Sequence, residues 1–269
     1  MSTNTLIDPL DLPRPPQQIK RSRVRTYDAV VVRMSKRTHD TFELVVKVQD
    51  DTEVFGASAG QFATLRVPGI RRPRSYSFAK SPQNEVPGEY TFFIRQVDGG
   101  EMSAWLGEKD RIGESLQISG PLGNFGVDES QQPMICIAGG SGMSAIKALV
   151  EHASKMQLPR DCYFFYGARS QKDLYCQEEM QAIKEAWHPQ HTFEFVCVLS
   201  EEPGDSDWQG PRGFVTDYFK TNYLDTSRVD ARDSRVFFCG PPPMTEAVAN
   251  LLLVERRLPM ERVHYDQFF

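Results

Sequence analysis

Short runs rich in β-branched and aromatic residues, separated by Gly, Pro, Asp and Asn, dominate the chain between about residues 24 and 119. The runs are Tyr27–Met34, Phe42–Val48, Gln61–Val67, Ser75–Phe78, Tyr90–Val97 and Ser115–Ser119. Several short strands at this spacing are typical of an antiparallel barrel or sandwich. One helix is expected to interrupt them, from Ser103 to Glu108, with Ser103 as its cap.

From about residue 129 the pattern changes to continuous apolar runs that alternate with helical periodicity. A run such as Pro133–Ala138 is typical of a parallel strand buried on both faces. The further expected elements are strands Cys162–Tyr166, Phe193–Leu199 and Arg235–Cys239, and helices Met143–Met156, Asp173–Trp187, Gly213–Lys220 and Pro243–Arg257. Strands that alternate with helices predict a doubly wound parallel sheet.

The two patterns predict a two-domain chain. An antiparallel β domain is expected at 22–128 and an α/β domain at 129–269. The prolines of residues 1–21 preclude helix and sheet, so this stretch is predicted to be a proline-rich tail.

Composition narrows the possible functions. The 269 residues are 40% hydrophobic and 25% charged, as in a globular protein, and carry a net charge of −5. That charge argues against a nucleic-acid surface. No apolar run approaches the roughly 20 residues that span a bilayer. Met1–Pro16 does not resemble a secretory signal, so a cytoplasmic protein is expected.

The five cysteines are Cys136, Cys162, Cys176, Cys197 and Cys239. Their number is odd and no two are spaced as a CxxC pair. This argues against a disulfide framework, a zinc site or an iron–sulfur cluster made by this chain, and no metal ligand is expected.

The stretch Arg74-Ser75-Tyr76-Ser77 combines three groups that suit a flavin nucleotide. An arginine fork matches a phosphate, a tyrosine ring lies flat on a heterocycle, and a hydroxyl donates to a ring nitrogen. The alternative is an ordinary polar strand end. A second phosphate cradle is expected at Gly99–Ser103, where glycines precede the short helix; a hairpin turn with a cap explains the same residues.

The α/β domain opens with Gly139-Gly140-Ser141-Gly142. Gly140, Gly142 and Ala145 fit the G-x-G-x-x-G/A dinucleotide motif between a buried strand and a helix, although a plain tight turn is the alternative. After the next expected strand the sequence has Arg169 where an acidic ribose ligand is usual. Arg169 either meets a 2′-phosphate, which favours NADP, or packs on the adenine.

Cys239-Gly240-Pro241 follows the fourth expected strand, at the sheet edge where such folds bind ligands. The alternative for Cys239 is a core residue, and a nucleophilic thiol is disfavoured because no histidine shows a partnering motif. The chain ends in Phe268-Phe269. Phe269 either docks on the core or covers the open face of a bound ring.

Taken in order, these motifs resemble the ferredoxin–NADP⁺ reductase superfamily, most closely the reductase components of bacterial aromatic-ring and alkane oxygenases. The matching segments are Arg74–Ser77, Gly99–Ser103, Gly120–Gly123, Gly139–Gly142, Tyr166–Arg169 with Asp173–Tyr175, and Cys239–Pro242. The resemblance implies a six-stranded antiparallel flavin-binding barrel followed by a nicotinamide-binding domain.

The resemblance also implies roles for individual residues. Arg74 would bind the flavin phosphate, Tyr76 would stack on the isoalloxazine and Ser77 would hydrogen-bond N5. The turn of Gly100, Glu101, Met102 and Ser103 would take the pyrophosphate, which favours FAD over FMN. The remaining implied ligands are Gly139, Gly140, Ser141, Gly142 and Arg169 for the nucleotide, Cys239, Gly240 and Pro241 near nicotinamide C4, and Phe269 as the flavin's cover.

In the oxygenase reductases the Gly-Ala-Arg…Asp-Leu-Tyr pattern goes with NADH, so NADH is expected and NADPH stays possible. Ala145 stands where the family usually has proline.

No four-cysteine ferredoxin module is evident, so a separate ferredoxin or oxygenase component is expected to accept the electrons. Two alternatives remain open: a free-flavin or ferric reductase, and a redox-sensing flavoprotein subunit.

Overall fold

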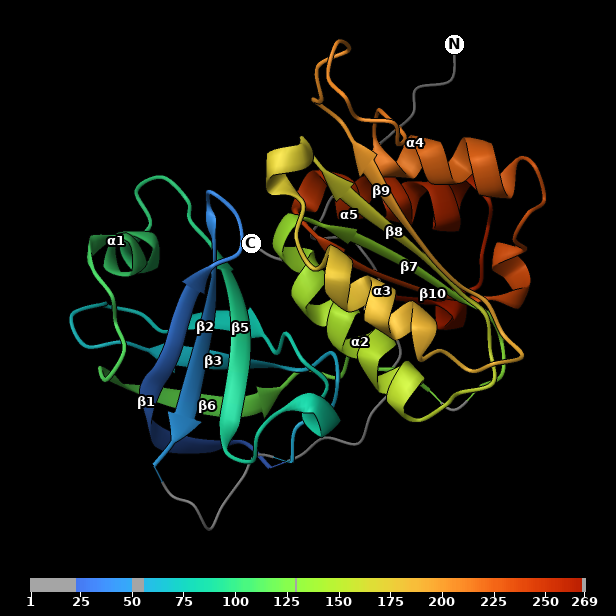
Figure 1. Ribbon diagram of the computed structural model, residues 1–269. Helices are drawn as coiled ribbons and strands as arrows, with labels where there is room; N and C mark the ends of the chain where they lie inside the picture. The colour runs from blue at the N-terminus through green and yellow to red at the C-terminus, as the bar shows by residue number, and fades with distance from the viewer. Residues whose placement is uncertain (1–22, 50–55, 129, 268–269) are drawn as a thin grey trace. The chain divides into compact units, whose positions relative to one another are not determined.

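The computed structural model describes residues 23–49, 56–128 and 130–267. They fall into two compact units, one within residues 17–128 together with 147–156 and the other within the rest of the chain. Each unit has its own sheet (Figure 1).

The first unit is a six-stranded antiparallel sheet that curls into a near-barrel, in the order β4-β3-β6-β1-β2-β5. Its strands are β1 (Arg25–Lys36), β2 (Thr41–Val48), β3 (Phe62–Arg66), β4 (Arg74–Ser77), β5 (Glu89–Arg95) and β6 (Ser115–Leu122). A bridge between Phe78 and Phe92 joins the two ends of this order. Strand β6 runs three residues beyond the end expected at Ser119, because Gly120–Leu122 continue it.

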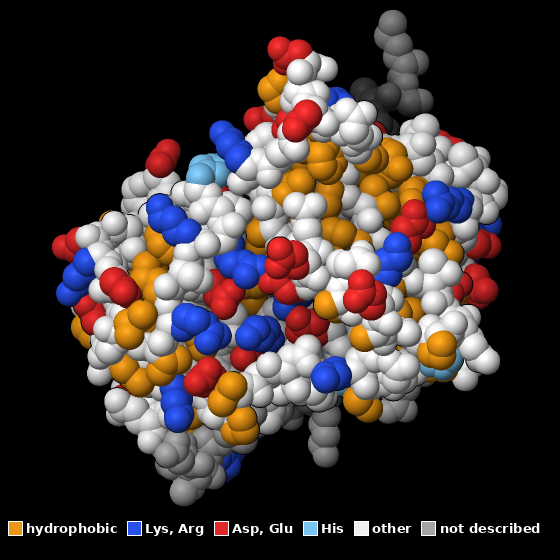
Figure 2. Space-filling view, in the orientation of Figure 1, with side chains coloured by type: hydrophobic (Ala, Val, Ile, Leu, Met, Phe, Trp, Pro, Cys, Tyr) orange, Lys and Arg blue, Asp and Glu red, His pale blue; other side chains and the backbone are white. Residues whose placement is uncertain are grey.

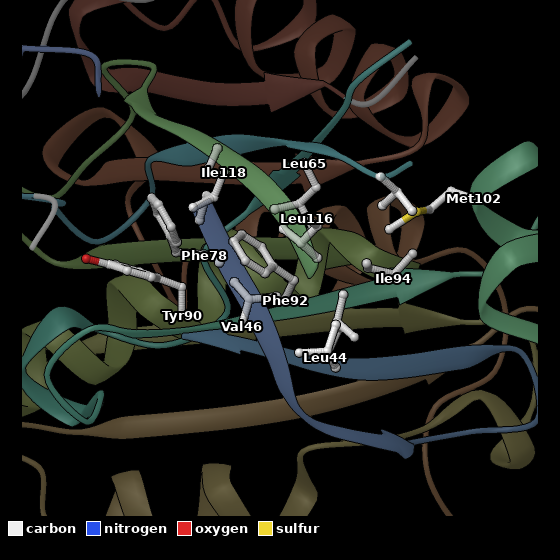
Figure 3. Close-up of a cluster of buried hydrophobic side chains, with 14 of the residues drawn as sticks. Leu44, Val46, Leu65, Phe78, Tyr90, Phe92, Ile94, Met102, Leu116 and Ile118 are labelled. Atoms are coloured by element: carbon white, nitrogen blue, oxygen red, sulfur yellow. The ribbon is translucent and has the colours of Figure 1, made fainter. Parts of the chain in front are cut away.

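The barrel interior is filled by alternate residues of its strands. Figure 3 shows this cluster, in which Phe78 and Tyr90 lie toward one end and Met102 reaches in from α1 (Glu101–Glu108) at the other. Met102 and Leu106 are both buried in the cluster, so they fix α1 against the end of the barrel.

The second unit contains a five-stranded parallel sheet in the order β11-β10-β7-β8-β9. Its strands are β7 (Met134–Gly139), β8 (Cys162–Ala168), β9 (Phe193–Leu199), β10 (Arg235–Gly240) and β11 (Val263–Gln267). The sequence pattern predicted four of these strands and missed β11. Every residue of β7 is buried, as its continuous apolar run indicated.

Helices cover both faces of this sheet (Figure 1). They are α2 (Met143–Lys155), α3 (Gln177–Glu185), α4 (Val215–Phe219) and α5 (Pro242–Ala249), and π-helical turns over Lys220–Leu224 and Asn250–Glu255 extend the last two. Residues of α4 and α5 share one hydrophobic cluster with Ile135, Phe165 and Val236 of the sheet. No helix among the described residues is both long and apolar enough to cross a membrane.

Candidate functional site

The stretch Arg74–Ser77 is the whole of strand β4, paired antiparallel with β3. Side chains alternate along a strand, so Arg74 and Tyr76 share one face while Ser75 and Ser77 share the other. Ser75 is exposed and Arg74 and Tyr76 are half-buried. An arginine fork and an aromatic ring therefore stand two residues apart on one face, the arrangement needed to hold a phosphate and a flat ring together.

The ring of Tyr76 packs against the hydrophobic cluster of the barrel. This burial raises the pKa of Tyr76 to about 12, although the nearby charge of Arg74 acts in the opposite direction. The phenol is accordingly neutral at physiological pH, and its ring offers an apolar surface to a planar ligand.

Ser77 ends β4 with its side chain buried. Among the described residues, its Oγ has no hydrogen-bond partner. A buried hydroxyl without a partner is costly. A ring nitrogen or carbonyl of a bound flavin would satisfy it, so this residue fits the cofactor that the sequence predicts.

The turn Gly99–Ser103 leads into α1. Gly99 has a φ of +70°, which glycine adopts without strain. The prediction that Ser103 caps the helix is wrong: the cap is Gly100, and Ser103 lies inside α1. The Ser103 hydroxyl instead accepts a hydrogen bond of 2.7 Å from the Val97 amide and holds the preceding turn in place.

The N-cap residue of α1 is Gly100, which has no side chain to bond the first helix amides. The first amide groups of a helix have no partner within the helix, and together with the helix dipole they attract anions. Glu101, the first residue of α1, lies at this end, with its Oε2 atom 2.9 Å from Nη2 of Arg74. The structure therefore brings together the two predicted phosphate-binding elements, β4 and the turn before α1. Met102 contributes through its backbone alone, because its side chain is in the core.

In the α/β unit, Gly139 ends β7 and Gly140-Ser141-Gly142 form a 3₁₀ turn that leads directly into α2. Gly140 has a φ of +52°. Its carbonyl oxygen accepts a hydrogen bond of 3.0 Å from the hydroxyl of Tyr175 and a longer one of 3.5 Å from Tyr166. The two tyrosines hold the carbonyl of Gly140 in place, and the turn leads to the N-terminus of α2, an end of a helix that attracts anions.

The glycine turn after β7 touches the turn after β10. A Cβ atom on Gly142 would stand 2.0 Å from the carbonyl oxygen of Cys239, so only glycine allows this approach. Gly139 and Gly240 meet in the same place, around the side chain of Met244. Two motifs about one hundred residues apart in the sequence thus meet at one edge of the sheet, the edge where open α/β sheets bind nucleotides.

Cys239 lies at the end of β10 and is fully buried. Burial, together with the negative charge of Asp266, holds the pKa of its thiol well above the usual range. His264 pairs with Phe237 in the β10–β11 register and stacks on its ring at 5.1 Å, whereas Cys239 pairs with Asp266. A protonated thiol in this setting does not suit nucleophilic catalysis. Its expected role beside nicotinamide C4 stays a prediction.

Arg169 lies just beyond the end of β8, where it is exposed. Its Nη2 atom is 3.2 Å from Oδ1 of Asp173, while Oδ2 of the same carboxylate accepts hydrogen bonds from the amide and hydroxyl of Ser170. These bonds explain why the helix predicted from Asp173 begins only at Gln177. Asp173 closes a capping box over a 3₁₀ turn, and Cys176 follows with a φ of +63°.

Acidic side chains surround this loop. The Glu202 carboxylate accepts hydrogen bonds from the amide and the side chain of Gln171, and these bonds lower its pKa. The Glu201 amide donates to the carbonyl oxygen of Arg169 at 2.7 Å. Asp173 is held in place by Ser170, so its pairing with Arg169 is supported by further bonds within the same loop. Whether Arg169 meets a 2′-phosphate or packs on the adenine stays a prediction.

Sequence reasoning gave no role to Phe214, which occupies the N-cap position of α4 and is 69% exposed. It also missed how Tyr166 and Tyr175 hold Gly140. The signal for Phe214 is weak, since nothing local distinguishes an exposed phenylalanine from a buried one. Phe269 lies outside the described residues, so its predicted role as a flavin cover stays a prediction.

Comparisons with known proteins match each of the two units to a known type of domain. Residues 28–126 match the oxidoreductase FAD-binding domain and residues 136–250 match the oxidoreductase NAD-binding domain. The chain is 39% identical over 241 residues to the xylene/toluene monooxygenase electron transfer component of Pseudomonas putida, covering 90% of this chain and 65% of that protein.

Two further relatives agree. The reductase component of phenol 2-monooxygenase from Pseudomonas sp. (strain CF600) is 34% identical over 213 residues, which are 77% of this chain and 57% of that protein. The ferredoxin reductase in carbazole 1,9a-dioxygenase superposes with a TM-score of 0.80 at 27% identity, over 93% of this chain and 71% of that one. The chain therefore spans less than two thirds of the length of the two curated relatives.

Proposed function

We propose a function from one premise: this chain belongs to the FAD- and NAD-binding oxidoreductases homologous to reductase components of bacterial multicomponent oxygenases. It oxidises NADH and passes the electrons through FAD to an iron-containing partner protein. The partner is a ferredoxin or the iron centre of an oxygenase component. The cytoplasm, which supplies NADH, is the proposed location. All five cysteines are free thiols, as expected in a reducing compartment.

One observation carries the flavin half of the proposal. Arg74 of β4 pairs with the side chain of Glu101, the first residue of α1, so a guanidinium lies near the end of a helix that attracts anions. Both groups attract phosphate oxygens. Tyr76 and Ser77, on the same strand, add a flat apolar surface and a hydroxyl in need of a partner.

The same residues suggest separate roles for the cofactor and for the protein. Bound FAD supplies the redox chemistry, because it accepts a hydride and releases single electrons. Arg74 and α1 hold the phosphates, Tyr76 orients the ring, and Ser77 donates to a ring nitrogen. In the α/β unit, the turns at Gly139–Gly142 and Cys239–Pro241 hold the nicotinamide nucleotide.

The choice of NADH over NADPH rests on Asp173. Its carboxylate neutralises Arg169, the one arginine at the end of β8 that a 2′-phosphate would need. Glu201 and Glu202 add negative charge to the same loops. We therefore assign the nucleotide site to NADH, in agreement with the expectation from the motif.

Removing the Arg74 charge tests the flavin site. We expect Arg74→Ala to weaken FAD binding by roughly tenfold or more, because a charge-assisted phosphate contact contributes about 1.5–3 kcal/mol. The dissociation constant is measured by titrating flavin-free protein with FAD and following the quenching of flavin fluorescence. Arg66→Ala, which removes an exposed arginine at the end of β3, is the matched control.

Unchanged FAD affinity in Arg74→Ala would contradict the assignment. The electron-transfer half is tested with the FAD-loaded protein in a stopped-flow spectrometer, where NADH should bleach the flavin absorbance within seconds. Bleaching only over minutes would favour the redox-sensing alternative. Loss of FAD during gel filtration of the wild-type protein would favour the free-flavin reductase.

A further inference from the structure

The side chain of Glu101 pairs with Arg74, the residue that we assign to the flavin phosphate. Its carboxylate lies 2.9 Å from Nη2 of Arg74, and Nη1 of the same guanidinium donates to the carbonyl oxygen of Arg72 at 3.0 Å. Both terminal nitrogens of Arg74 are therefore engaged with oxygens of this chain.

Glu101 also stands at the first position of α1, where the helix dipole favours a negative charge. The carboxylate is thus attracted by the same two elements, the guanidinium and the helix N-terminus, that would attract a phosphate. The Arg74 guanidinium and the N-terminus of α1 cannot bind a ligand phosphate and the Glu101 carboxylate at the same time.

The ion pair between Arg74 and Glu101 breaks readily. The side chains of Arg74 and Glu101 are 38% and 48% exposed, and ion pairs at such positions are weak because water screens them. Neither side chain is needed to hold α1 in place, since Met102 and Leu106 anchor the helix in the core. Glu101 can therefore leave Arg74 without disturbing the barrel.

We propose that the Glu101 carboxylate competes with the flavin phosphate for Arg74. By pairing with Arg74, Glu101 lowers the affinity of the chain for FAD. The proposal rests on the assignment of Arg74 to the flavin site and adds a control on how tightly flavin is retained. Glu101 is a positioning residue, because it acts by holding Arg74. A chain with such a competitor binds FAD more weakly than one without it.

The test compares two flavins that differ in the phosphate. Flavin-free Glu101→Gln protein is titrated with FAD and with riboflavin, which has the isoalloxazine ring and no phosphate, by fluorescence quenching. FAD should bind about fivefold more tightly than to the wild type, and riboflavin should bind equally to both. Glu89→Gln, the same charge change at the start of β5, should leave both dissociation constants unchanged.

A double-mutant cycle shows whether the effect passes through Arg74. In an Arg74→Ala background, Glu101→Gln should no longer tighten FAD binding. Unchanged FAD affinity in Glu101→Gln, equal tightening of FAD and riboflavin, or a full gain in the Arg74→Ala background would each overturn the proposal. Because Arg74→Ala alone tests the flavin site, loss of FAD there combined with no effect of Glu101→Gln refutes the competitor and leaves the site intact.

Discussion

Phe214 is the most exposed of the large hydrophobic side chains that the structure describes, and its surroundings suggest why. The amide of Gly213 donates to the carbonyl oxygen of Leu199 at 2.8 Å, and Val215 packs over Gly167. These contacts hold Phe214 beside the ends of β8 and β9. In open α/β sheets that edge receives the nucleotide, so we expect the exposed ring to stack on the adenine.

Truncating this ring tests the stacking role. We expect Phe214→Ala to raise the KM for NADH about tenfold with little change in kcat, because stacking of a base on an aromatic side chain contributes roughly 1–3 kcal/mol. Reduced nicotinamide mononucleotide, which lacks the adenine, should be oxidised equally by both proteins. Val254→Ala, another exposed hydrophobic truncation, serves as the control. An equal KM for NADH in wild type and Phe214→Ala would refute the role.

At the residue scale, the sequence can predict functional residues that are close neighbours along the chain. Arg74, Tyr76 and Ser77 lie close together in one strand, so their order suggested a flavin clamp, with an ordinary polar strand end as the alternative. The pairing of Glu101 with Arg74 joins residues 27 positions apart and depends on how α1 docks on the barrel. The bond from Tyr175 to Gly140 spans 35 positions. Such contacts depend on tertiary packing, which no local pattern encodes.

At the scale of elements, the close approach of the β7 and β10 turns is the feature on which the nucleotide site depends. The backbone of Gly142 lies against Cys239 and Gly240, and the sheet order places β7 beside β10. A methyl group at position 142 would overlap backbone atoms rather than the end of a flexible side chain, so the turns would have to separate.

We therefore expect Gly142→Ala to lower the free energy of unfolding of the α/β unit by about 2 kcal/mol and to raise the KM for NADH. Urea unfolding followed by circular dichroism measures the first effect and steady-state kinetics the second. Gly204→Ala is the matched control, because a Cβ atom there meets nothing within 4 Å. If the two variants unfold at the same urea concentration, the contact between the turns is not what requires glycine.

Element prediction worked where the pattern was strong and failed where it was short or polar. The continuous apolar runs predicted β7 to β10, whereas the five residues of β11 include His264, Asp266 and Gln267 and give no strand signal. The start of α3 was placed too early because Asp173, which looks like a helix residue, closes a local capping box instead. Local hydrogen bonds of this kind compete with helix formation.

At the scale of the whole molecule, both units bury groups that ionise at high pH. Burial raises the pKa of Tyr76 in the barrel, and it also raises the pKa of Tyr166 and Tyr223 in the α/β unit. Hydrogen bonding to Glu194 adds to the shift of Tyr223. The buried thiols of Cys162 and Cys239 are shifted in the same direction. Each of these groups is held in its neutral form by the folded chain.

The sign of the resulting pH dependence follows from linkage. A tyrosine in the unfolded chain loses its proton near pH 10, while folded Tyr76 keeps its proton until about pH 12. Between these values the unfolded state binds fewer protons than the folded state, so stability falls as the pH rises. The contribution of Tyr76 is fully present below pH 10 and is lost by about pH 12.

We expect the midpoint of urea unfolding to be lower at pH 11 than at pH 9, with Tyr76 contributing roughly 1 kcal/mol to the difference. Tyr76→Phe should lessen the loss, because phenylalanine fills the same space and cannot ionise. Equal losses in wild type and Tyr76→Phe would mean that Tyr76 ionises in the barrel as readily as in water. Its ring would then not be the neutral, apolar surface that the flavin site requires.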